Sequence, residues 1–343
     1  MTTLRRLWRL LPAGLRTSRP ATYLKRLLGS QPAPAIPHPE TPHAPADQPR
    51  VIQTLEDLDA AIRHLEAAAA ISDDALRREF PKFTMRTPAD LPGDPDSEGY
   101  RARQFALYER LHGKPYSLAN ETSAMDVLER ADRPFPFLTG SSMTVGSQLM
   151  AIGFLIRQLD LPAASRVLEF GPGWGNTTIA LGRMGHHVTA VDIEPNFVAL
   201  IAERSRRKRL GSAIDVRQGD FSSISQLDGT FHTVLFFESF HHSSNHQTLV
   251  AGFDGVVAPG GQVVFAGEPI SAGFPIPWGL RLDGESLWAI RRYGWLELGF
   301  REDYFINLFA RHGWSVTKAV SADLEATHSG WGTVYTARRS RRE

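Results

Sequence analysis

A glycine-rich turn between two acids is the part of this sequence best suited to chemistry. Residues 169–175 (EFGPGWG) follow a short apolar run, a helical pattern comes next, and a second apolar run ends at Asp192. A side chain at Gly171, Gly173 or Gly175 would occupy the space of a small ligand, so glycine lets the backbone approach one. The Asp192 carboxylate is placed to accept both hydroxyls of a ribose. The pattern predicts a site for an adenosine-containing cofactor.

Two classes of adenosine cofactor compete for this turn. A nicotinamide or flavin site requires G-x-G-x-x-G, but the third glycine position is Asn176 here. The spacing found is acid-x-G-x-G-x-G, beginning at Glu169. This resembles the first motif of the class I S-adenosylmethionine (SAM)-dependent methyltransferases. Taken alone, the turn also fits an ordinary tight connection between a strand and a helix.

The elements after the turn agree with that resemblance over residues 145–337. The next strand ends at Gly219-Asp220-Phe221, where the family places an acid for the adenine amino group and an apolar residue against the ring. The resemblance implies an α/β, Rossmann-like class I methyltransferase fold, a seven-stranded mostly parallel sheet with helices on both faces, and SAM as cofactor. The cofactor-binding residues it implies are Glu169, Gly171, Gly173, Gly175, Asn176, Asp192, Ile193, Asp220 and Phe221.

The catalytic groups are expected after the strand at 233–237, beside the transferable methyl group. Methyl transfer is an in-line displacement driven mainly by the cofactor, so the protein orients the acceptor and removes a proton. Histidine is suited to that step near neutral pH, which makes His241 or His242 the candidate base. Glu238 either orients the base or contacts the cofactor. In the alternative interpretation, one histidine only packs and forms hydrogen bonds.

A metal site is not expected from the sequence. Glu268, at the end of the fifth strand, could bind a divalent cation together with Glu238. Metal-dependent O-methyltransferases usually present clustered aspartates here, and this chain does not. Cysteine is absent, which excludes disulfides, cysteine-ligated zinc and thiol chemistry.

A helical extension at 51–140 is predicted to precede the SAM-binding domain at 141–343 and to form a lid. Apolar spacing predicts a helix capped by Thr54 or Asp57, and Ser72 or Asp73 is suited to begin a second. A third helix is expected to stop at Gly113. The hydroxyls of Thr139, Ser141 and Ser142 either seat the methionine carboxylate of SAM or simply cap a helix.

An insert near 270–300 is the predicted specificity element. Aromatic faces stack on sugar rings or on flat apolar acceptors, and arginines bind carboxylates or phosphates. The alternative is that the aromatics are only the core of the lid. The side chains concerned are Phe274, Trp278, Trp288, Tyr293, Trp295, Phe300, Arg281, Arg291 and Arg292.

Charge is distributed unevenly along the 343 residues. Residues 1–50 carry a net charge of +6 and residues 338–343 carry +3, so with +1 overall the segment between them carries −8. An acidic body argues against a nucleic-acid partner.

Residues 1–30 are basic and apolar, which is typical either of a peripheral anchor on an anionic membrane or of a disordered tail. Residues 31–50 are rich in proline and alanine and are predicted to be a disordered linker.

The whole pattern looks most like bacterial methyltransferases associated with cell-surface polysaccharide biosynthesis. It suggests O-methylation of a sugar hydroxyl in a glycan or in a lipid- or nucleotide-linked saccharide. The alternatives are a methyltransferase for a quinone, lipid or other metabolite, and a non-catalytic SAM-binding partner protein. A cytoplasmic location is expected, with peripheral contact at the inner membrane surface if residues 1–30 are an anchor.

Overall fold

The computed structural model describes residues 48–122, 125–325 and 330–340. The chain divides into the units 1–47 and 48–343, and only the second is described. The predicted anchor at 1–30 and almost all of the predicted linker therefore lie outside the described residues. Within the described ranges, no helix is both long enough and apolar enough to cross a membrane.

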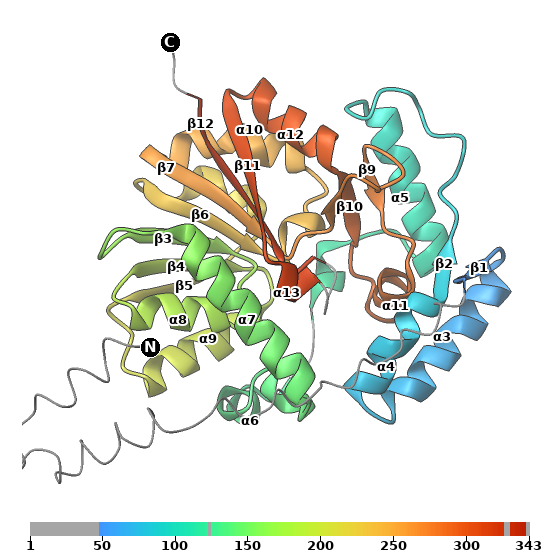
Figure 1. Cartoon of the computed structure of the whole chain (residues 1–343), viewed down its shortest axis with the longest axis horizontal. Helices are drawn as coiled ribbons and strands as arrows, with labels where there is room; N and C mark the ends of the chain where they lie inside the picture. Colours follow the sequence, from blue (N-terminus) through green and yellow to red (C-terminus); the bar gives the residue numbers. More distant parts are fainter. Residues whose placement is uncertain (1–47, 123–124, 326–329, 341–343) are drawn as a thin grey trace, which may run out of the picture. The chain divides into compact units, whose positions relative to one another are not determined.

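A seven-stranded sheet forms the centre of the described unit (Figure 1). Its strand order is β11-β12-β7-β6-β3-β4-β5, and β12 runs antiparallel to both of its neighbours. The other pairings are parallel. This arrangement confirms the fold class predicted from the sequence. The strands are β3 (Arg166–Phe170), β4 (His187–Asp192), β5 (Ile214–Gln218), β6 (Phe231–Phe237), β7 (Val257–Ala266), β11 (Trp314–Val320) and β12 (Thr333–Arg339).

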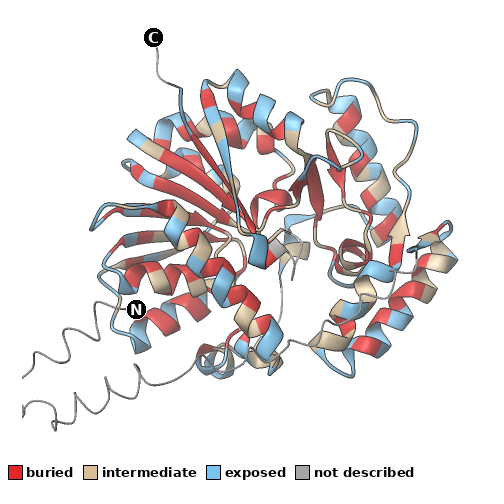
Figure 2. Cartoon of the chain, in the orientation of Figure 1, coloured by how far each residue is buried: buried red, intermediate tan, exposed pale blue. Residues whose placement is uncertain are grey.

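Helices cover both faces of this sheet, and the central strands are buried between them, whereas the edge strands β5 and β11 are largely exposed (Figure 2). Alternate strand residues point to opposite faces. In β6, Leu235 packs against the helices on one face of the sheet, whereas Val234 and Phe236 pack against the helices on the opposite face. The first set is α7 (Ser142–Leu159), α8 (Asn176–Arg183) and α9 (Pro195–Arg207), and the second is α10 (His246–Val256) and α12 (Glu302–Arg311).

Two segments far apart in sequence pack together as a lid layer, defined here as residues 50–112 and 270–301. Tyr100 donates from its hydroxyl to the Trp278 carbonyl at 2.8 Å, and the Met85 amide donates to the Leu282 carbonyl at 2.8 Å. The N-terminal extension is thus joined to the insert. Its elements are β1 (Arg50–Ile52), α3 (Leu55–Ala69), α4 (Asp73–Glu79), β2 (Phe83–Met85) and α5 (Glu98–His112), followed in the insert by β8 (Ile270–Ser271), β9 (Trp278–Leu280), α11 (Gly284–Tyr293) and β10 (Leu298–Arg301).

The helix boundaries of the lid layer follow the predicted signals. The Thr54 hydroxyl accepts from the Asp57 amide while the Asp57 carboxylate accepts from the Thr54 amide, a reciprocal cap that begins α3. The Ser72 side chain caps the start of α4, and α5 ends at Gly113. The short helices α6 (Val127–Asp132) and α13 (Ala322–Glu325) complete the described α-helices.

Candidate functional site

The glycine turn connects β3 to α8 and faces open space. Gly171 has φ +60°, and a Cβ built there would lie 2.5 Å from the Ser239 Cβ, so a side chain is excluded. Gly173 has φ +50°, yet a Cβ there would meet no atom within 4 Å. Because Gly173 lines two adjoining cavities, that space is available to a ligand. Gly175, the third glycine, precedes the first residue of α8.

The first of these cavities, the cofactor cavity, has a volume of about 390 Å³ and lies at the carboxyl ends of β3 to β6. Six of the nine predicted cofactor residues line it: Gly171, Gly173, Asp192, Ile193, Asp220 and Phe221. Asp220 accepts from the Ser222 amide at 2.8 Å, which holds its carboxylate at the rim. Tyr116, Leu118 and Glu121 line the same cavity from residues upstream of the SAM-binding domain, and the sequence carried no signal for them.

Asp192 is where the ribose acid was predicted. Its two carboxylate oxygens accept from the backbone N–H groups of Gly173 and Glu194, each at 2.9 Å. These bonds fix the carboxylate against the glycine turn. Burial raises the pKa of Asp192 to about 6, although both backbone bonds favour the charged form.

Glu169 and Asn176 do not line the cofactor cavity. The Glu169 carboxylate is buried and accepts from the Thr178 hydroxyl at 2.6 Å. Burial raises its pKa to about 7. The Asn176 amide donates to the Phe135 carbonyl at 2.7 Å and accepts from Arg204 at 2.9 Å. These bonds hold both residues beside the turn. Asn176 lines the second cavity, described next, and contact of either residue with the cofactor stays a prediction.

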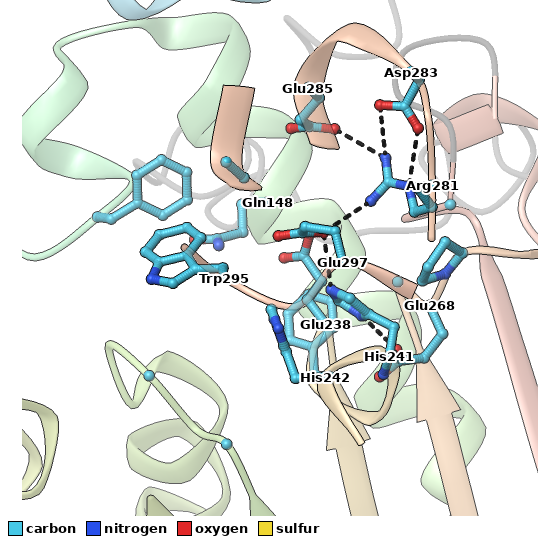
Figure 3. A pocket seen from close by; sticks show the side chains of 18 of the residues that line it. Gln148, Glu238, His241, His242, Glu268, Arg281, Asp283, Glu285, Trp295 and Glu297 are labelled. Carbon is cyan, nitrogen blue, oxygen red and sulfur yellow. Dashed lines mark hydrogen bonds and ion pairs between the residues drawn. The ribbon is translucent and has the colours of Figure 1, made fainter. Parts of the chain in front are cut away.

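The second cavity, the acceptor cavity, has a volume of about 660 Å³ and adjoins the first (Figure 3). The sheet edge supplies one wall and the lid layer supplies another, including Leu76 of α4 and Trp288 of α11. Both cavities are lined by Gly171, Gly173, Phe197, Glu238, His242 and Trp295. These six residues form the junction where a cofactor and an acceptor would meet.

The three predicted catalytic residues lie at or beside this junction. Glu238 has a left-handed backbone (φ +53°), uncommon for a residue with a side chain, and its carboxylate accepts from the Trp331 indole N–H at 2.6 Å. Burial raises its pKa to about 7. His241 lines the acceptor cavity, with its Nδ1 2.8 Å from the Glu268 Oε2.

Glu268 has a different role from the one considered for it as a metal ligand. Its Oε1 accepts from the amides of Ser239 and Phe240, both at 2.9 Å, and its Oε2 accepts from the His241 amide at 3.1 Å. Burial opposes its charge, but the bond from His241 and these amides lower its pKa. Both Glu268 oxygens thus hold in place the segment 239–242, which is called the histidine loop below.

Three carboxylates surround the two histidines. His242 lies with its ring centroid 4.2 Å from that of His241. Burial opposes a charge on His242, but Glu121, Glu297 and Glu268 outweigh this and raise its pKa. Neither Glu121 nor Glu297 was singled out from the sequence. Glu297 lies inside the predicted insert, but an isolated glutamate in an aromatic-rich stretch gave no sign of its position.

The insert divides into cavity and core residues. Phe274, Trp288 and Trp295 line the acceptor cavity, whereas Trp278 is buried against Tyr100. Tyr293 and Phe300 do not line it. The aromatics therefore divide between the cavity wall and the core, and contact of the first group with an acceptor stays a prediction.

The insert's arginines are bonded within the chain. Arg281 lines the cavity but pairs with Asp283, Glu285 and Glu297 at 3.0 to 3.4 Å (Figure 3). Arg291 binds Asp59 at 2.7 Å. Arg292 lies 3.8 Å from Glu66. The described structure thus gives these arginines carboxylate partners of their own, which weakens the prediction that they hold an anionic acceptor.

The hydroxyl groups that precede α7 form hydrogen bonds with backbone groups of their own segment. Ser141 accepts from the Thr144 amide at 3.0 Å as the helix cap, and Thr139 donates to the Pro136 carbonyl at 2.7 Å. Neither they nor Ser142 line the cofactor or acceptor cavity. Of the two readings open from the sequence, helix capping is the one observed.

Comparison with known proteins agrees with this geometry. Residues 168–265, which hold the glycine turn, Asp192, Asp220 and the histidine loop, match a family model described as a methyltransferase domain. The match supports the class of domain predicted from the sequence, with SAM as its cofactor. It covers strands β3 to β6 and nearly all of β7, but neither the lid layer nor β11 and β12.

Individual relatives differ in chemistry. Over 110 residues the chain is 32% identical to an S-adenosyl-L-methionine-dependent Diels-Alderase of Talaromyces variabilis, covering 32% of this chain and 38% of that protein. A glycine/sarcosine/dimethylglycine N-methyltransferase of Actinopolyspora halophila is 28% identical over 34% of this chain and 20% of its own length. The chain thus spans well under half of these curated relatives.

Among solved structures, the Burkholderia thailandensis 1,6-didemethyltoxoflavin-N1-methyltransferase resembles this chain with a TM-score of 0.44 and 20% identity. The superposition covers 65% of this chain and 88% of that one. Likeness at this level says nothing about the acceptor.

Proposed function

We propose that this protein is a SAM-dependent methyltransferase that methylates an acceptor bound beneath the lid layer. The observation that carries the proposal is the junction: the glycine turn, Glu238 and His242 line both the cofactor cavity and the acceptor cavity. A methyl group in the first cavity then has a direct path to a nucleophile in the second. Such an arrangement holds the two reactants in line, which is the main task of the protein in this reaction.

The acceptor we propose is a sugar hydroxyl in a glycan or in a lipid- or nucleotide-linked saccharide. The acceptor cavity combines the aromatic side chains of Trp174, Trp288 and Trp295 with carboxylates and imidazoles. Aromatic faces suit sugar rings, and carboxylates accept hydrogen bonds from hydroxyls. His241 and His242 would activate the hydroxyl. The ion pairs of Arg281 favour a neutral acceptor group over a phosphate at this depth.

Transfer of a radiolabelled methyl group from SAM tests this proposal. Purified protein is incubated with nucleotide sugars, lipid-linked saccharides, polysaccharide fragments and, as a comparison, quinols. Label in a saccharide supports the proposal, and label only in a quinol or another metabolite supports the alternative acceptor class. SAM binding without transfer to any acceptor would favour a non-catalytic SAM-binding partner.

The location we propose is the cytoplasm, at the inner membrane surface where lipid-linked glycans are accessible. Support comes from the sequence alone. Residues 1–30 are basic and apolar, and the chain has no cysteine, which fits a reducing compartment.

A further inference from the structure

The tautomer of His241 is determined by its neighbours. Glu268 accepts backbone N–H bonds at both oxygens, so it is a hydrogen-bond acceptor toward the ring as well. The His241 Nδ1, 2.8 Å away, must therefore carry the proton, which leaves the lone pair on Nε2. Histidines that bind metal ions show this arrangement, because a carboxylate on one nitrogen orients the other.

That lone pair faces another acceptor. The His241 Nε2 lies 3.6 Å from the Glu297 Oε2, which is too long for a hydrogen bond. The His242 Nδ1 is buried without a hydrogen-bond partner among the described residues, and the Glu121 Oε2 lies 3.7 Å from it. The ring nitrogens of His241 and His242 thus each lie near a carboxylate, but beyond hydrogen-bond distance. Figure 3 shows His241 beside Glu297. A bound cation would give both ring nitrogens and the Glu297 carboxylate a partner at bonding distance.

We propose that His241, His242 and Glu297 bind a divalent transition-metal ion on the wall of the acceptor cavity. One ligand atom from each residue lies within 4.8 Å of the other two. Ligands about 2.1 Å from a metal lie roughly 3.0–3.4 Å apart, so small side-chain rotations complete the geometry. Two imidazoles and one carboxylate suit Zn²⁺, Fe²⁺, Co²⁺ or Ni²⁺ better than Mg²⁺ or Ca²⁺, which prefer oxygen ligands.

The surrounding charges favour a cation. Glu121 and Glu268 add two carboxylates beside the three ligands. The nearest positive group, Arg281, lies 3.4 Å from Glu297, but it also pairs with Asp283 and Glu285. Its charge is therefore compensated locally. The side-chain exposures are 8% for His241, 9% for Glu297 and 24% for His242, so water screens the attraction only in part.

The role of this ion rests on the proposed function, whereas its binding does not. An acceptor oxygen bonded to the ion loses its proton more readily. The new O–CH₃ bond then forms as the S–CH₃ bond of SAM breaks, and the hydroxyl proton passes to the Glu238 carboxylate, which lines both cavities. This arrangement replaces a free histidine base with a metal-bound acceptor, and it departs from the sequence-based expectation of no metal.

Cobalt titration tests the site. Full-length protein is treated with EDTA, dialysed and titrated with CoCl₂, following visible absorption and heat. We expect one Co²⁺ per chain, competed by Zn²⁺ and not by Mg²⁺. His241→Ala, His242→Ala and Glu297→Gln should each weaken binding by about tenfold or more. His241→Ala and Glu297→Gln change residues that do not line the cofactor cavity, so they should leave affinity for S-adenosylhomocysteine within about twofold. His187→Ala, on the exposed start of β4, is the matched control and should bind normally.

Absence of Co²⁺ binding to wild-type protein that binds S-adenosylhomocysteine would overturn the proposal. Unchanged Co²⁺ affinity in the His241→Ala/His242→Ala double variant would do the same. Because Glu297→Gln preserves side-chain size, it guards against a misleading loss through misfolding, and a thermal melt checks each variant. Co²⁺ binding without S-adenosylhomocysteine binding would instead refute the proposed function and leave the metal site standing.

Discussion

Asp192 shows how one carboxylate is prepared for a ribose. Its oxygens already accept the amides of Gly173 and Glu194, so their remaining lone pairs point to fixed places at the edge of the cofactor cavity. Burial makes this carboxylate harder to ionise, and its pKa of about 6 leaves it charged at neutral pH. The free-energy cost of burying the Asp192 carboxylate is offset when the two ribose hydroxyls donate hydrogen bonds to it.

Replacing Asp192 by Asn should weaken SAM binding by roughly one to two orders of magnitude, because an amide NH₂ would oppose one of the two backbone donors or the ribose. In the wild type, affinity should also fall as the pH drops below about 6, where the carboxyl takes up a proton. Calorimetric titration from pH 5 to pH 8 measures both effects. Asp215→Asn, an exposed acid on β5, is the control, and equal affinities in the two variants would refute a ribose contact.

The raised pKa of Glu169 predicts that stability, rather than ligand binding, depends on pH. Its folded-state pKa of about 7 lies above the ordinary glutamate value of 4.5, so the folded protein holds this proton more tightly than the unfolded chain does. Its contribution is then fully present below pH 4.5, is lost as the pH rises toward 7, and is constant above that. The change is at most about 3 kcal/mol.

Urea unfolding of wild type and Glu169→Gln at pH 5 and pH 8 measures this contribution. Glutamine can still accept from Thr178 but does not titrate, so the variant should lose less stability between the two pH values. Other titrating groups are common to both proteins. Parallel losses would show that Glu169 has an ordinary pKa.

At the scale of elements, the glycine turn depends on how closely β6 passes behind it. An alanine Cβ at position 171 would lie 2.5 Å from the Ser239 Cβ and would require a left-handed backbone. Gly171→Ala should therefore lower the free energy of unfolding by about 1–3 kcal/mol and abolish measurable SAM binding. Gly255→Ala, in α10 where a Cβ would meet nothing within 4 Å, should be neutral or slightly stabilising. Normal SAM binding by Gly171→Ala would contradict the described turn.

The lid layer depends on contacts between its two segments. Arg291 of α11 binds Asp59 of α3 at 2.7 Å and donates to the Leu111 carbonyl of α5 at 3.0 Å. Arg291→Met should cost about 1–2 kcal/mol and lower transfer to the acceptor without changing SAM affinity. Arg292→Met removes an exposed 3.8 Å contact with Glu66 and a cation–π contact 6.0 Å from the Tyr293 ring centroid, and it should cost less than Arg291→Met. Chemical unfolding measures the free energy of unfolding of the two variants. Equal losses would argue that Arg291 does not connect the two segments of the lid layer.

Local signals explain which parts were predictable from the sequence. The sheet and the turn were readable because strands, glycines and strand-end acids carry short-range patterns, and Ser72 and Gly113 marked helix boundaries in the same way. Glu121 and Glu297 were not readable. Glu297 acquires its role only when the lid layer brings it to the histidine loop, and Glu121 only when the segment after α5 does so. No spacing in the sequence encodes either approach. A motif gives a residue's position but not the direction of its side chain, so the bond between the Glu169 carboxylate and Thr178 could not be predicted from the sequence.

At the scale of the whole molecule, residues 1–30 are predicted to act separately from the catalytic unit, which begins at residue 48. Deleting them should abolish sedimentation with vesicles containing anionic lipid, because six arginines and one lysine are removed, and should leave SAM affinity unchanged. Vesicles of neutral lipid serve as the control. Full sedimentation by the shortened chain would contradict the anchor.

The central claim is that the cavity around Gly173 and Asp192 binds SAM. Calorimetric titration of the purified protein with SAM, S-adenosylhomocysteine and NAD tests it most directly. The account predicts micromolar binding of the first two compounds, one molecule per chain, and no binding of NAD. Binding of NAD with no response to SAM would contradict it.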